Sequence, residues 1–574
     1  MRLNVLLLVV VGFLFAACSN SESGVSSSTS LDAGCTTVRS FTGSTITITG
    51  SADYEFRING NGVINSTIAT PNLPIRQAQV VIYSSSGSEV QCGSTDDSGN
   101  FSMVVPQISG NYTVSVDSRI YNSMTKAGVL NNPTEQAVHS ITTTLAGTSS
   151  ASVGTLTATA SGTIKGGAFN ILDKIYGANL YLVTNTAGCS GSFTGCSPFT
   201  DAPAVSIYWD AGVNPGSYFS AGALSFYLPG ARELYILGGI SGNTNSSDCD
   251  HFDNSIILHE YGHFIEDVFA DTDSPGGTHT GNAIVDARLA WGEGWANFFQ
   301  AATLNNPIYR DTSGNVSGSS SVYFDEDLET PENDIPTQMG EGNFREFSIT
   351  RLLWDSIDVV NEGAGVDTVS GTFAELWTIF TSTTTGFKNS SYVFRNMGLF
   401  HTLQQALGAT NWSSLRTGEN QLGNQNDYSR AVASSSSACT PASVTITAAN
   451  NPGGSTENGT AARSNQFDSN DFYRYNHPGG AFSFRLDYTT TPSAADLDVY
   501  IFRNSYQFTS TTSSSLAASA TTNVTMGTTS ASETISTSLS AGWYMINIRV
   551  DTASGLPSPA DYSMTLNGSN LCPN

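Results

Sequence analysis

The chain has 574 residues, which is room for roughly three or four domains of about 150 residues each. Charged residues make up only 12% of it, about half of the ~25% that is typical of soluble proteins. With 22 basic against 48 acidic side chains, the net charge of −26 argues against a basic face for phosphates, so we expect no nucleic-acid partner. A hydrophobic content of 39% and 55 glycines indicate folded, strand-rich domains with many turns.

The first residues have the pattern of an export signal. Arg2 precedes an apolar stretch over residues 3–15, which is too short to span a membrane comfortably. The small residues before Cys18 resemble a bacterial lipobox, which implies that residues 1–17 are removed and that Cys18 carries a lipid. Because Phe15 is not the commonest residue three positions before such a cysteine, cleavage by an ordinary signal peptidase stays open.

This interpretation predicts an exported bacterial lipoprotein of the outer membrane or cell surface, or a form released outside the cell. Residues 18–40 would then be a Ser-rich, flexible tether. No later segment has 18 consecutive apolar residues, so we expect membrane contact only through the N-terminal lipid anchor.

Seven further cysteines follow Cys18, and an exported chain meets an oxidising compartment in which disulfides form. No two of them have CxxC spacing, so a zinc ribbon or a thioredoxin-like motif is not expected. Cys249 would be left unpaired. The sequence does not fix the connectivity, but the positions favour three pairs: Cys35–Cys92, Cys189–Cys196 and Cys439–Cys572.

Residues 41–160 have the alternation expected of β-strands. Ala78, Val80 and Ile82 share one face at a period of two, and the segment TDDSGNF at residues 95–101 is typical of a turn. The order of strand, turn and strand resembles the carboxypeptidase-regulatory-like β-sandwiches of bacterial surface proteins. That resemblance implies a fold and no chemistry.

Residues 161–438 change character and predict an α+β domain. From about residue 253 to 424 the apolar period is mostly 3.6, so the second half should be helical. We expect residues 234–237, just before that half, to form a strand edge that binds extended substrate by strand addition. The first half should contain a helix around residues 168–179 and short strands at residues 205–209, 224–228 and 234–237.

The sequence HEYGH at residues 259–263 carries the most specific chemical signal. On a helix, His259 and His263 point the same way and can bind one Zn²⁺ ion, while Glu260 is placed to take a proton from a metal-bound water. Asp253 is the expected N-cap of this helix. A structural histidine pair is the alternative, although an HExxH by chance is rare in a chain with seven histidines.

Zinc needs a third protein ligand, and the metzincin continuation is absent after His263. Glu293, in the apolar segment GEGWANFF, is the first candidate because a buried carboxylate is costly unless it is paired or binds a cation. His279 is the second candidate. The alternative is a structural Glu293 paired with Arg288 or Arg310.

An HExxH followed by a glutamate on a second helix is the gluzincin arrangement, and HEYGH with GEGWANFF resembles the fungalysin-type metallopeptidases. The segment FSITRLLWD at residues 347–355 is similar to a later helix of that family. The resemblance spans roughly residues 250–360. It implies that His259, His263 and Glu293 bind one zinc ion and that Glu260 is the general base.

One residue departs from that family pattern. The family commonly has an aspartate four residues after the ligand glutamate, where it orients a ligand histidine. This chain has Asn297, which can accept a hydrogen bond but brings no charge.

The developing oxyanion of peptide hydrolysis usually needs a further donor. We prefer His279, because it lies between the two ligand segments, and the sequence leaves four more candidates: Tyr309, Tyr323, Arg345 and His401. Ca²⁺ is a separate possibility at the acidic residues 325–327 with Glu329, where a solvated loop is the alternative.

Residues 439–574 return to alternating strands, interrupted by Ser/Thr/Ala-rich residues 509–538, which predict a long loop with weak strands. The order of DFYRY at residues 471–475, DLDVYI at 496–501 and LSAGWY at 539–544 resembles the bacterial pre-peptidase C-terminal domain. Such domains are small, non-catalytic β-sandwiches appended to secreted proteases.

The sequence therefore predicts a multidomain α+β protein with an N-terminal β-sandwich, a gluzincin-like catalytic domain with a mostly helical second half, and a C-terminal β-sandwich. We expect a zinc-dependent peptidase, an endopeptidase first, that acts on proteins or peptides. Two alternatives stay open. One is a catalytically degenerate surface adhesin or binding lipoprotein, and the other is a purely structural envelope protein.

Overall fold

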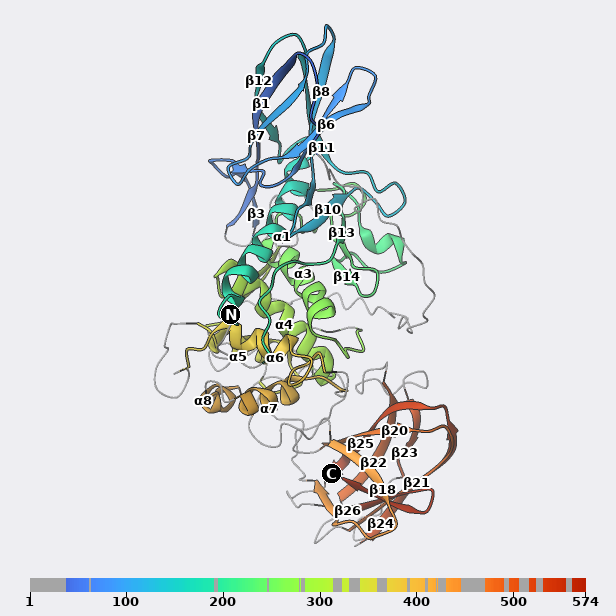
Figure 1. The fold of residues 1–574 in the computed structure, drawn as a ribbon. Coiled ribbons are helices and arrows are strands. Elements are labelled where there is room, and N and C mark those ends of the chain that lie inside the picture. Colours follow the sequence, from blue (N-terminus) through green and yellow to red (C-terminus); the bar gives the residue numbers. More distant parts are fainter. Residues whose placement is uncertain are drawn as a thin grey trace, which may run out of the picture.

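Strands gather at the two ends of the molecule, and most of the helices lie between them (Figure 1). The predicted signal peptide, Cys18 and Cys35 lie outside the part of the chain that can be described. No helix in the described part is long and apolar enough to cross a bilayer. The computed structural model describes residues 38–60, 63–189, 195–244, 247–277, 279, 284–312, 323–329, 341–358, 369–389, 393–407, 411–419, 421, 430–444, 470–489, 495–504, 516–522, 530–553 and 560–573.

The N-terminal strands form two sheets that share a core. Ile46 and Ile48 of β1 are buried together with Val80 and Ile82 of β5, as the alternating pattern requires. A separate hairpin joins β2 (Arg57–Gly60) to β3 (Val63–Ile68). The first sheet has the order β12 (Ala151–Ala158), β1 (Thr45–Tyr54) and β4 (Leu73–Pro74), with β7 (Asn100–Pro106) also on β1; the second has the order β11 (Ser140–Ala146), β8 (Asn111–Asp117), β5 (Gln79–Ser84) and β6 (Glu89–Ser94).

The predicted turn at residues 95–101 joins β6 to β7. The Asp96 Oδ1 atom accepts hydrogen bonds from the backbone N–H groups of Ser98 and Asn100, at 2.9 and 2.8 Å. Gly99 has φ +78°, a conformation that glycine adopts without strain. The sequence TDDSGNF therefore forms the tight connection that its residue types indicate.

A third sheet, in the middle of the molecule, begins inside the range predicted for the sandwich. Its strand β10 pairs in parallel with β13, far along the chain. One continuous core runs from the sandwich into this sheet and the helices. The order is β14 (Phe226–Leu228), β15 (Glu233–Tyr235), β13 (Val205–Tyr208), β10 (Lys126–Leu130) and β9 (Arg119–Tyr121).

Helix α1 links this sheet to the helical part. Its buried Asn179 accepts a hydrogen bond from the Tyr261 hydroxyl at 2.7 Å, and its Asn170 amide donates to the carbonyl of His251 at 2.9 Å. Both partners belong to the α3 region, so α1 fixes α3 against the sheet. The helices are α1 (Lys165–Thr186), α3 (Asn254–Phe269), α4 (Ala287–Leu304), α5 (Glu346–Asp355), α6 (Phe373–Thr381), α7 (Met397–Leu407) and α8 (Ser413–Gly418), with a 3₁₀ turn η2 (Pro215–Tyr218) and a hairpin of β16 (Ile308–Thr312) and β17 (Tyr323–Asp327).

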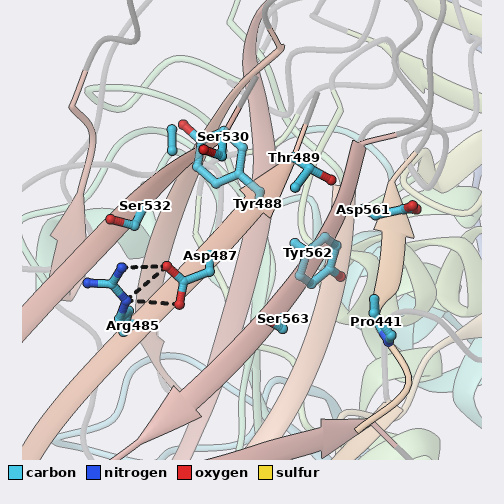
Figure 2. A pocket seen from close by; sticks show the side chains of 11 residues that line it. Pro441, Arg485, Asp487, Tyr488, Thr489, Ser530, Ser532, Asp561, Tyr562 and Ser563 are labelled. Atoms are coloured by element: carbon cyan, nitrogen blue, oxygen red, sulfur yellow. Dashed lines mark hydrogen bonds and ion pairs between the residues drawn. The ribbon is translucent and has the colours of Figure 1, made fainter. Parts of the chain in front are cut away.

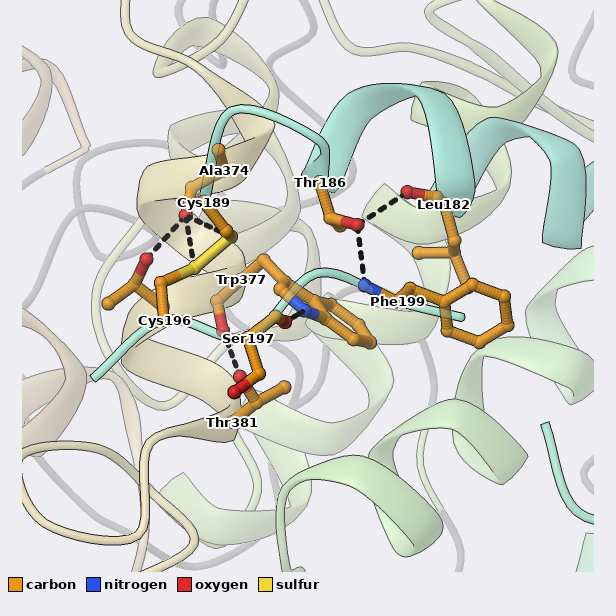
Figure 3. The surroundings of a disulfide bond; sticks show 10 residues. Leu182, Thr186, Cys189, Cys196, Ser197, Phe199, Ala374, Trp377 and Thr381 are labelled. Atoms are coloured by element: carbon orange, nitrogen blue, oxygen red, sulfur yellow. Dashed lines mark hydrogen bonds between the residues drawn. A yellow bond between two sulfur atoms is a disulfide. The ribbon is translucent and has the colours of Figure 1, made fainter. Parts of the chain in front are cut away.

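The disulfide Cys189–Cys196 closes the loop after α1, as predicted (Figure 3). Both sulfur atoms lie beside the carbonyl oxygen of Ala374 on α6, at 4.0 and 3.9 Å. The Trp377 indole N–H donates to the Ser197 carbonyl at 3.0 Å. The loop is therefore held against α6. Cys92 is also disulfide-bonded, and its predicted partner Cys35 lies outside the described residues.

The C-terminal strands enclose their own core, which includes Phe484, Val499 and Ile546. The strands expected within residues 509–538 are present as β23 and β24, and β24 pairs with β21 along its whole length. Cys439 and Cys572 form the predicted disulfide. The strands are β18 (Arg430–Ser435), β19 (Ala442–Val444), β20 (Asn470–His477), β21 (Gly480–Thr489), β22 (Ala495–Arg503), β23 (Leu516–Ala520), β24 (Ser530–Leu539), β25 (Gly542–Ala553), β26 (Ala560–Leu566) and β27 (Ser569–Pro573).

A hollow of about 460 Å³ opens on this domain beside β21, β24 and β26 (Figure 2). Arg485 and Asp487 form an exposed ion pair on its wall, with nitrogen and oxygen 2.6 Å apart. No histidine or cysteine is among the described residues that line it, so the hollow offers no soft metal ligands.

The C-terminal domain packs directly on the start of α4. Ala287 and Phe344 form a small apolar cluster with Phe472, Phe502 and other residues of the C-terminal strands. Arg288, the second residue of α4, donates from Nη1 to the backbone oxygen and the Oδ1 atom of Asn504, at 2.6 and 2.9 Å. The helix that carries Glu293 is therefore braced by a separate domain.

The two described disulfides should differ in how much they stabilise the protein. The bond Cys439–Cys572 spans 133 residues and Cys189–Cys196 spans 7. Loop-closure entropy of the unfolded chain then gives about 5 kcal/mol for the first and about 2 kcal/mol for the second. We expect calorimetry of the full chain to find the larger loss of stability when Cys439 and Cys572 are both changed to Ser. A larger loss from the matched double change at Cys189 and Cys196 would contradict this.

Candidate metal centre

Helix α3 presents HEYGH from a largely buried position. Its apolar residues Ile257, Phe264 and Ile265 enter the core at helical spacing. Asp253 occupies the N-cap position, but its side chain does not cap the helix. Its Oδ2 atom instead accepts hydrogen bonds from the backbone N–H and the hydroxyl of Thr312, at 2.9 and 2.6 Å. The predicted cap residue therefore ties the start of α3 to β16.

Two glycines allow α4 to lie close to both neighbouring helices. A Cβ atom at Gly262 of α3 would lie 3.1 Å from the Cα of Ala296. The Trp295 indole N–H donates to the Gly262 carbonyl at 3.1 Å across the same contact. A Cβ atom at Gly294 would lie 2.7 Å from the Ile349 side chain of α5. The close contact between α3 and α4 brings Glu293, which precedes Gly294 on α4, next to His259 and His263 of α3.

Three side-chain atoms converge at this contact. The Nε2 atoms of His259 and His263 are 3.2 Å apart, and each lies 3.3 Å from the Glu293 Oε2 atom. Ligands placed tetrahedrally at about 2.0–2.1 Å from a zinc ion would be about 3.3–3.4 Å apart. The three atoms therefore have the spacing of a zinc site, and a fourth direction is left for water or substrate.

The state of Glu293 also fits a metal. The side chain is buried, and its Oε2 atom has ion-pair contacts with the two imidazoles but no well-formed hydrogen bond. Burial alone would raise the pKa of this carboxyl, but His279 and His263 outweigh it and hold the pKa well below the usual range. Arg288, one of the partners considered for a structural Glu293, pairs instead with Asp286 at 2.9 Å. An ionised, buried carboxylate of this kind suits a cation.

Asn297 lies one helical turn beyond Glu293 and contacts His259. Its Oδ1 atom is 2.7 Å from the His259 Nδ1 atom. If Nδ1 carries the proton, the Nε2 lone pair of His259 points toward Glu293 and is free for a metal. An asparagine can therefore set the tautomer of the histidine, although it supplies no charge.

His279 lies beside the Glu293 carboxylate oxygen that does not contact His259 and His263. Its Nε2 atom is 3.5 Å from Glu293 Oε1, and its Nδ1 atom is 2.8 Å from the Glu346 carboxylate. Burial would lower the pKa of His279, but these two carboxylates raise it to about 10. Sequence reasoning missed Glu346, because it immediately precedes the segment that carried the family resemblance.

Glu260 faces the edge of the middle sheet. Burial raises the pKa of Glu260, while the nearby His259 and His263 and the backbone N–H of Tyr227, on β14, act in the opposite direction. The expectation of a substrate edge at residues 234–237 is wrong, because β15 lies between β14 and β13. Among the described strands, β14 is the edge beside Glu260.

Tyr309, one of the donor candidates, is part of this site. Its ring centroid is 6.1 Å from that of His259. Burial, with the charge of Asp311 and other nearby carboxylates, raises its pKa well above the usual value, so the hydroxyl keeps its proton at neutral pH. Tyr323 lies opposite Thr312 in the β16–β17 hairpin, and its side chain is outside the described part of the structure.

The candidate His401 makes its contacts elsewhere in the helical part of the chain. His401, on α7, has its Nε2 atom 2.5 Å from Arg416 Nη1 and stacks near Trp412. Burial and the Arg416 charge lower its pKa to about 4, so it is a neutral packing residue of the α7–α8 region. Arg345 is buried at the N-cap position of α5, without a side-chain cap bond.

The acidic residues considered for Ca²⁺ have other partners. Glu326 is buried, with an oxygen 3.7 Å from Arg351 Nη1, and Glu329 accepts a hydrogen bond from the Trp354 indole at 2.7 Å. Asp327 accepts from the Glu329 backbone N–H. Among the described side chains these contacts do not form the convergent oxygen cage that calcium requires, and the side chain of Asp325 lies outside the described part.

Comparison with known proteins relates the middle of the chain to peptidases. Residues 191–397, which include the whole His–Glu cluster, match the family model of the mycolysin C-terminal domain, and this relates the region to secreted metallopeptidases. A solved structure, the pre-peptidase C-terminal domain of a collagenase from Bacillus anthracis, is 13% identical. It covers 17% of this chain and 78% of that chain, with a TM-score of 0.13. No curated protein matches the chain.

Asn297 should set the zinc affinity of the cluster. We expect Asn297→Ala to weaken zinc binding about 10–100-fold, because His259 would lose the group that fixes its tautomer. Asn297→Asp should retain or strengthen binding, since a carboxylate accepts the same hydrogen bond. Competition with a chromophoric chelator would measure this, with Thr303→Ala at the far end of α4 as the control. Equal zinc affinities for the wild type, Asn297→Ala, Asn297→Asp and Thr303→Ala would contradict the role of Asn297.

Proposed function

We propose that the chain is a zinc-dependent peptidase that hydrolyses peptide bonds in proteins or peptides. The observation that carries the proposal is the arrangement of His259, His263 and Glu293 at zinc-ligand spacing, with Glu260 adjacent. The relation of residues 191–397 to metallopeptidases supports it. The three ligand atoms would hold one ion per chain.

A bound Zn²⁺ ion would polarise the substrate carbonyl and lower the pKa of a water molecule in the open position. Glu260 would accept the proton of the attacking water and pass it to the leaving nitrogen. Its buried setting raises its pKa toward neutrality, which favours both steps of this transfer. The backbone N–H of Tyr227 lies near this carboxylate and favours its ionised form.

Strand β14 is suited to bind the substrate backbone. It is an edge strand in the described part of the middle sheet, and its Tyr227 contacts the proposed base. An extended peptide laid along β14 would run past Glu260. This edge replaces the one expected at residues 234–237.

Two further residues would assist the reaction. Tyr309 retains its hydroxyl proton and faces His259, so it can donate a hydrogen bond to the developing oxyanion. His279 is held by Glu346 and contacts the outer oxygen of Glu293, so it would act as a positioning residue for that ligand.

We also propose that the protein acts outside the cytoplasm. The apolar stretch at residues 3–15 and the lipobox-like sequence before Cys18 support an exported lipoprotein. Disulfides at Cys189–Cys196 and Cys439–Cys572 are consistent with an oxidising compartment. The net charge of −26 is unfavourable for a nucleic-acid partner.

Removal of Glu260 and removal of Glu293 should have different consequences. We expect Glu260→Gln to keep zinc but to lose casein hydrolysis about 10²–10⁴-fold, because only the proton transfer is removed. Glu293→Gln should lose both zinc and activity, since a neutral amide is a poor replacement for a carboxylate ligand. Metal content and casein hydrolysis of the full chain would be measured together, with and without a chelator.

Glu135→Gln is the matched control, since Glu135 is an exposed acid in the N-terminal region. It should retain zinc and activity. A folded wild-type chain without zinc or hydrolysis would reject the peptidase and favour the surface adhesin or binding protein. Zinc retained by Glu293→Gln would move the third ligand to another residue, with His279 first.

A further inference from the structure

A second group of acids lies just before α3, outside the His–Glu cluster. Asp248 and Asp250 precede the helix, and Asp311 lies on β16. One carboxylate oxygen from each lies within 4.8 Å of the others. Oxygens bound at 2.3–2.6 Å to one calcium ion can be at most about 5 Å apart, so a single ion can contact all three.

The carboxylate of Asp250 is buried without enough partners. Its side chain is 4% exposed, and its Oδ2 atom accepts a hydrogen bond from the Ser225 hydroxyl at 2.5 Å. Its Oδ1 atom, also buried, has no hydrogen-bond partner, and neither has the Oδ1 atom of Asp248. An unpartnered oxygen of this kind loses its hydration without compensation.

The three acids also repel one another. Burial and the charges of Asp248 and Asp311 raise the pKa of Asp250 well above its ordinary value. Burial and the charge of Asp311 raise the pKa of Asp248 to about 7. Burial raises the pKa of Asp311 to about 6. None of the three forms an ion pair with a lysine or arginine of the described chain.

We propose that Asp248, Asp250 and Asp311 bind a calcium ion that is distinct from the zinc of the His–Glu cluster. All three donors are carboxylate oxygens, which suit a hard cation, and no nitrogen or sulfur ligand is part of the group. The remaining coordination positions would be filled by water or backbone carbonyls. The proposal does not depend on peptidase activity.

The ion would join three segments that surround α3. Ser225, next to β14, donates to Asp250 and accepts from the backbone N–H of Leu237. Asp311 follows Tyr309 on β16 by two residues. Calcium would therefore fix the start of α3 relative to β14 and β16, and its expected effect is on stability.

Thermal unfolding of the metal-free full chain tests the proposal. We expect about 10 mM Ca²⁺, which exceeds the about 10⁻⁴–10⁻³ M dissociation constants of extracellular calcium modules, to raise the melting temperature of the wild type. Asp250→Asn and Asp311→Asn should lose this shift. Without calcium they should melt at or above the wild-type temperature, because each removes one repelling charge.

Asp327→Asn is the matched control, because it removes the same charge from β17, the partner of β16. It should keep the calcium shift. The proposal is overturned if the wild type has no shift, or if Asp250→Asn and Asp311→Asn keep it. If both variants fail to fold, calcium binding is measured instead by equilibrium dialysis of Asp248→Asn, which changes a less buried residue. A loss of about one bound calcium per chain relative to Asp327→Asn supports the site, and equal binding rejects it.

Discussion

The contact between α3 and α4 is the constraint on which the rest of the site depends. It is close because Gly262 has no side chain where Ala296 approaches, and it is held by the Trp295 indole bonded to the Gly262 carbonyl. At this separation Glu293 reaches both His259 and His263. A larger residue at Gly262 would push the carboxylate away from the imidazoles, so the middle residues of HEYGH matter as much for packing as its outer residues do for chemistry.

Other elements hold this contact from outside. Asn297 orients His259 from within α4, Glu346 of α5 holds His279, and Tyr309 of β16 packs on His259. Arg288 connects the first turn of α4 to Asn504 of the C-terminal domain. The helix that supplies the proposed third ligand is thus clamped at its N-terminal end and in its middle. A separate β-rich domain therefore contacts the helix that carries Glu293 without contributing a residue to the His–Glu cluster.

Local patterns predicted those parts of the protein that depend on local geometry. The i, i+4 spacing of His259 and His263 and the turn around Asp96 follow from the backbone alone. Long-range pairing could not be derived in the same way. Strands β14 and β15 have only three residues each, so nothing local indicates which of them is the edge. Asp250 and Asp311 are brought together only by the packing of β16 on α3, and His401 contacts Arg416 in the α7–α8 region instead of the cluster.

The buried acids of this protein are compensated in different ways, and the differences separate structural from functional groups. Glu419 and Asp286 are each bonded to a buried arginine, which is sufficient for a structural role. Glu266 has no such partner; burial raises its pKa to about 8, and the Trp291 indole donates to it. One proton therefore makes Glu266 neutral. Asp250 lies close to two other carboxylates, so one proton cannot neutralise all three acids. A divalent cation would balance the charge that remains in that group.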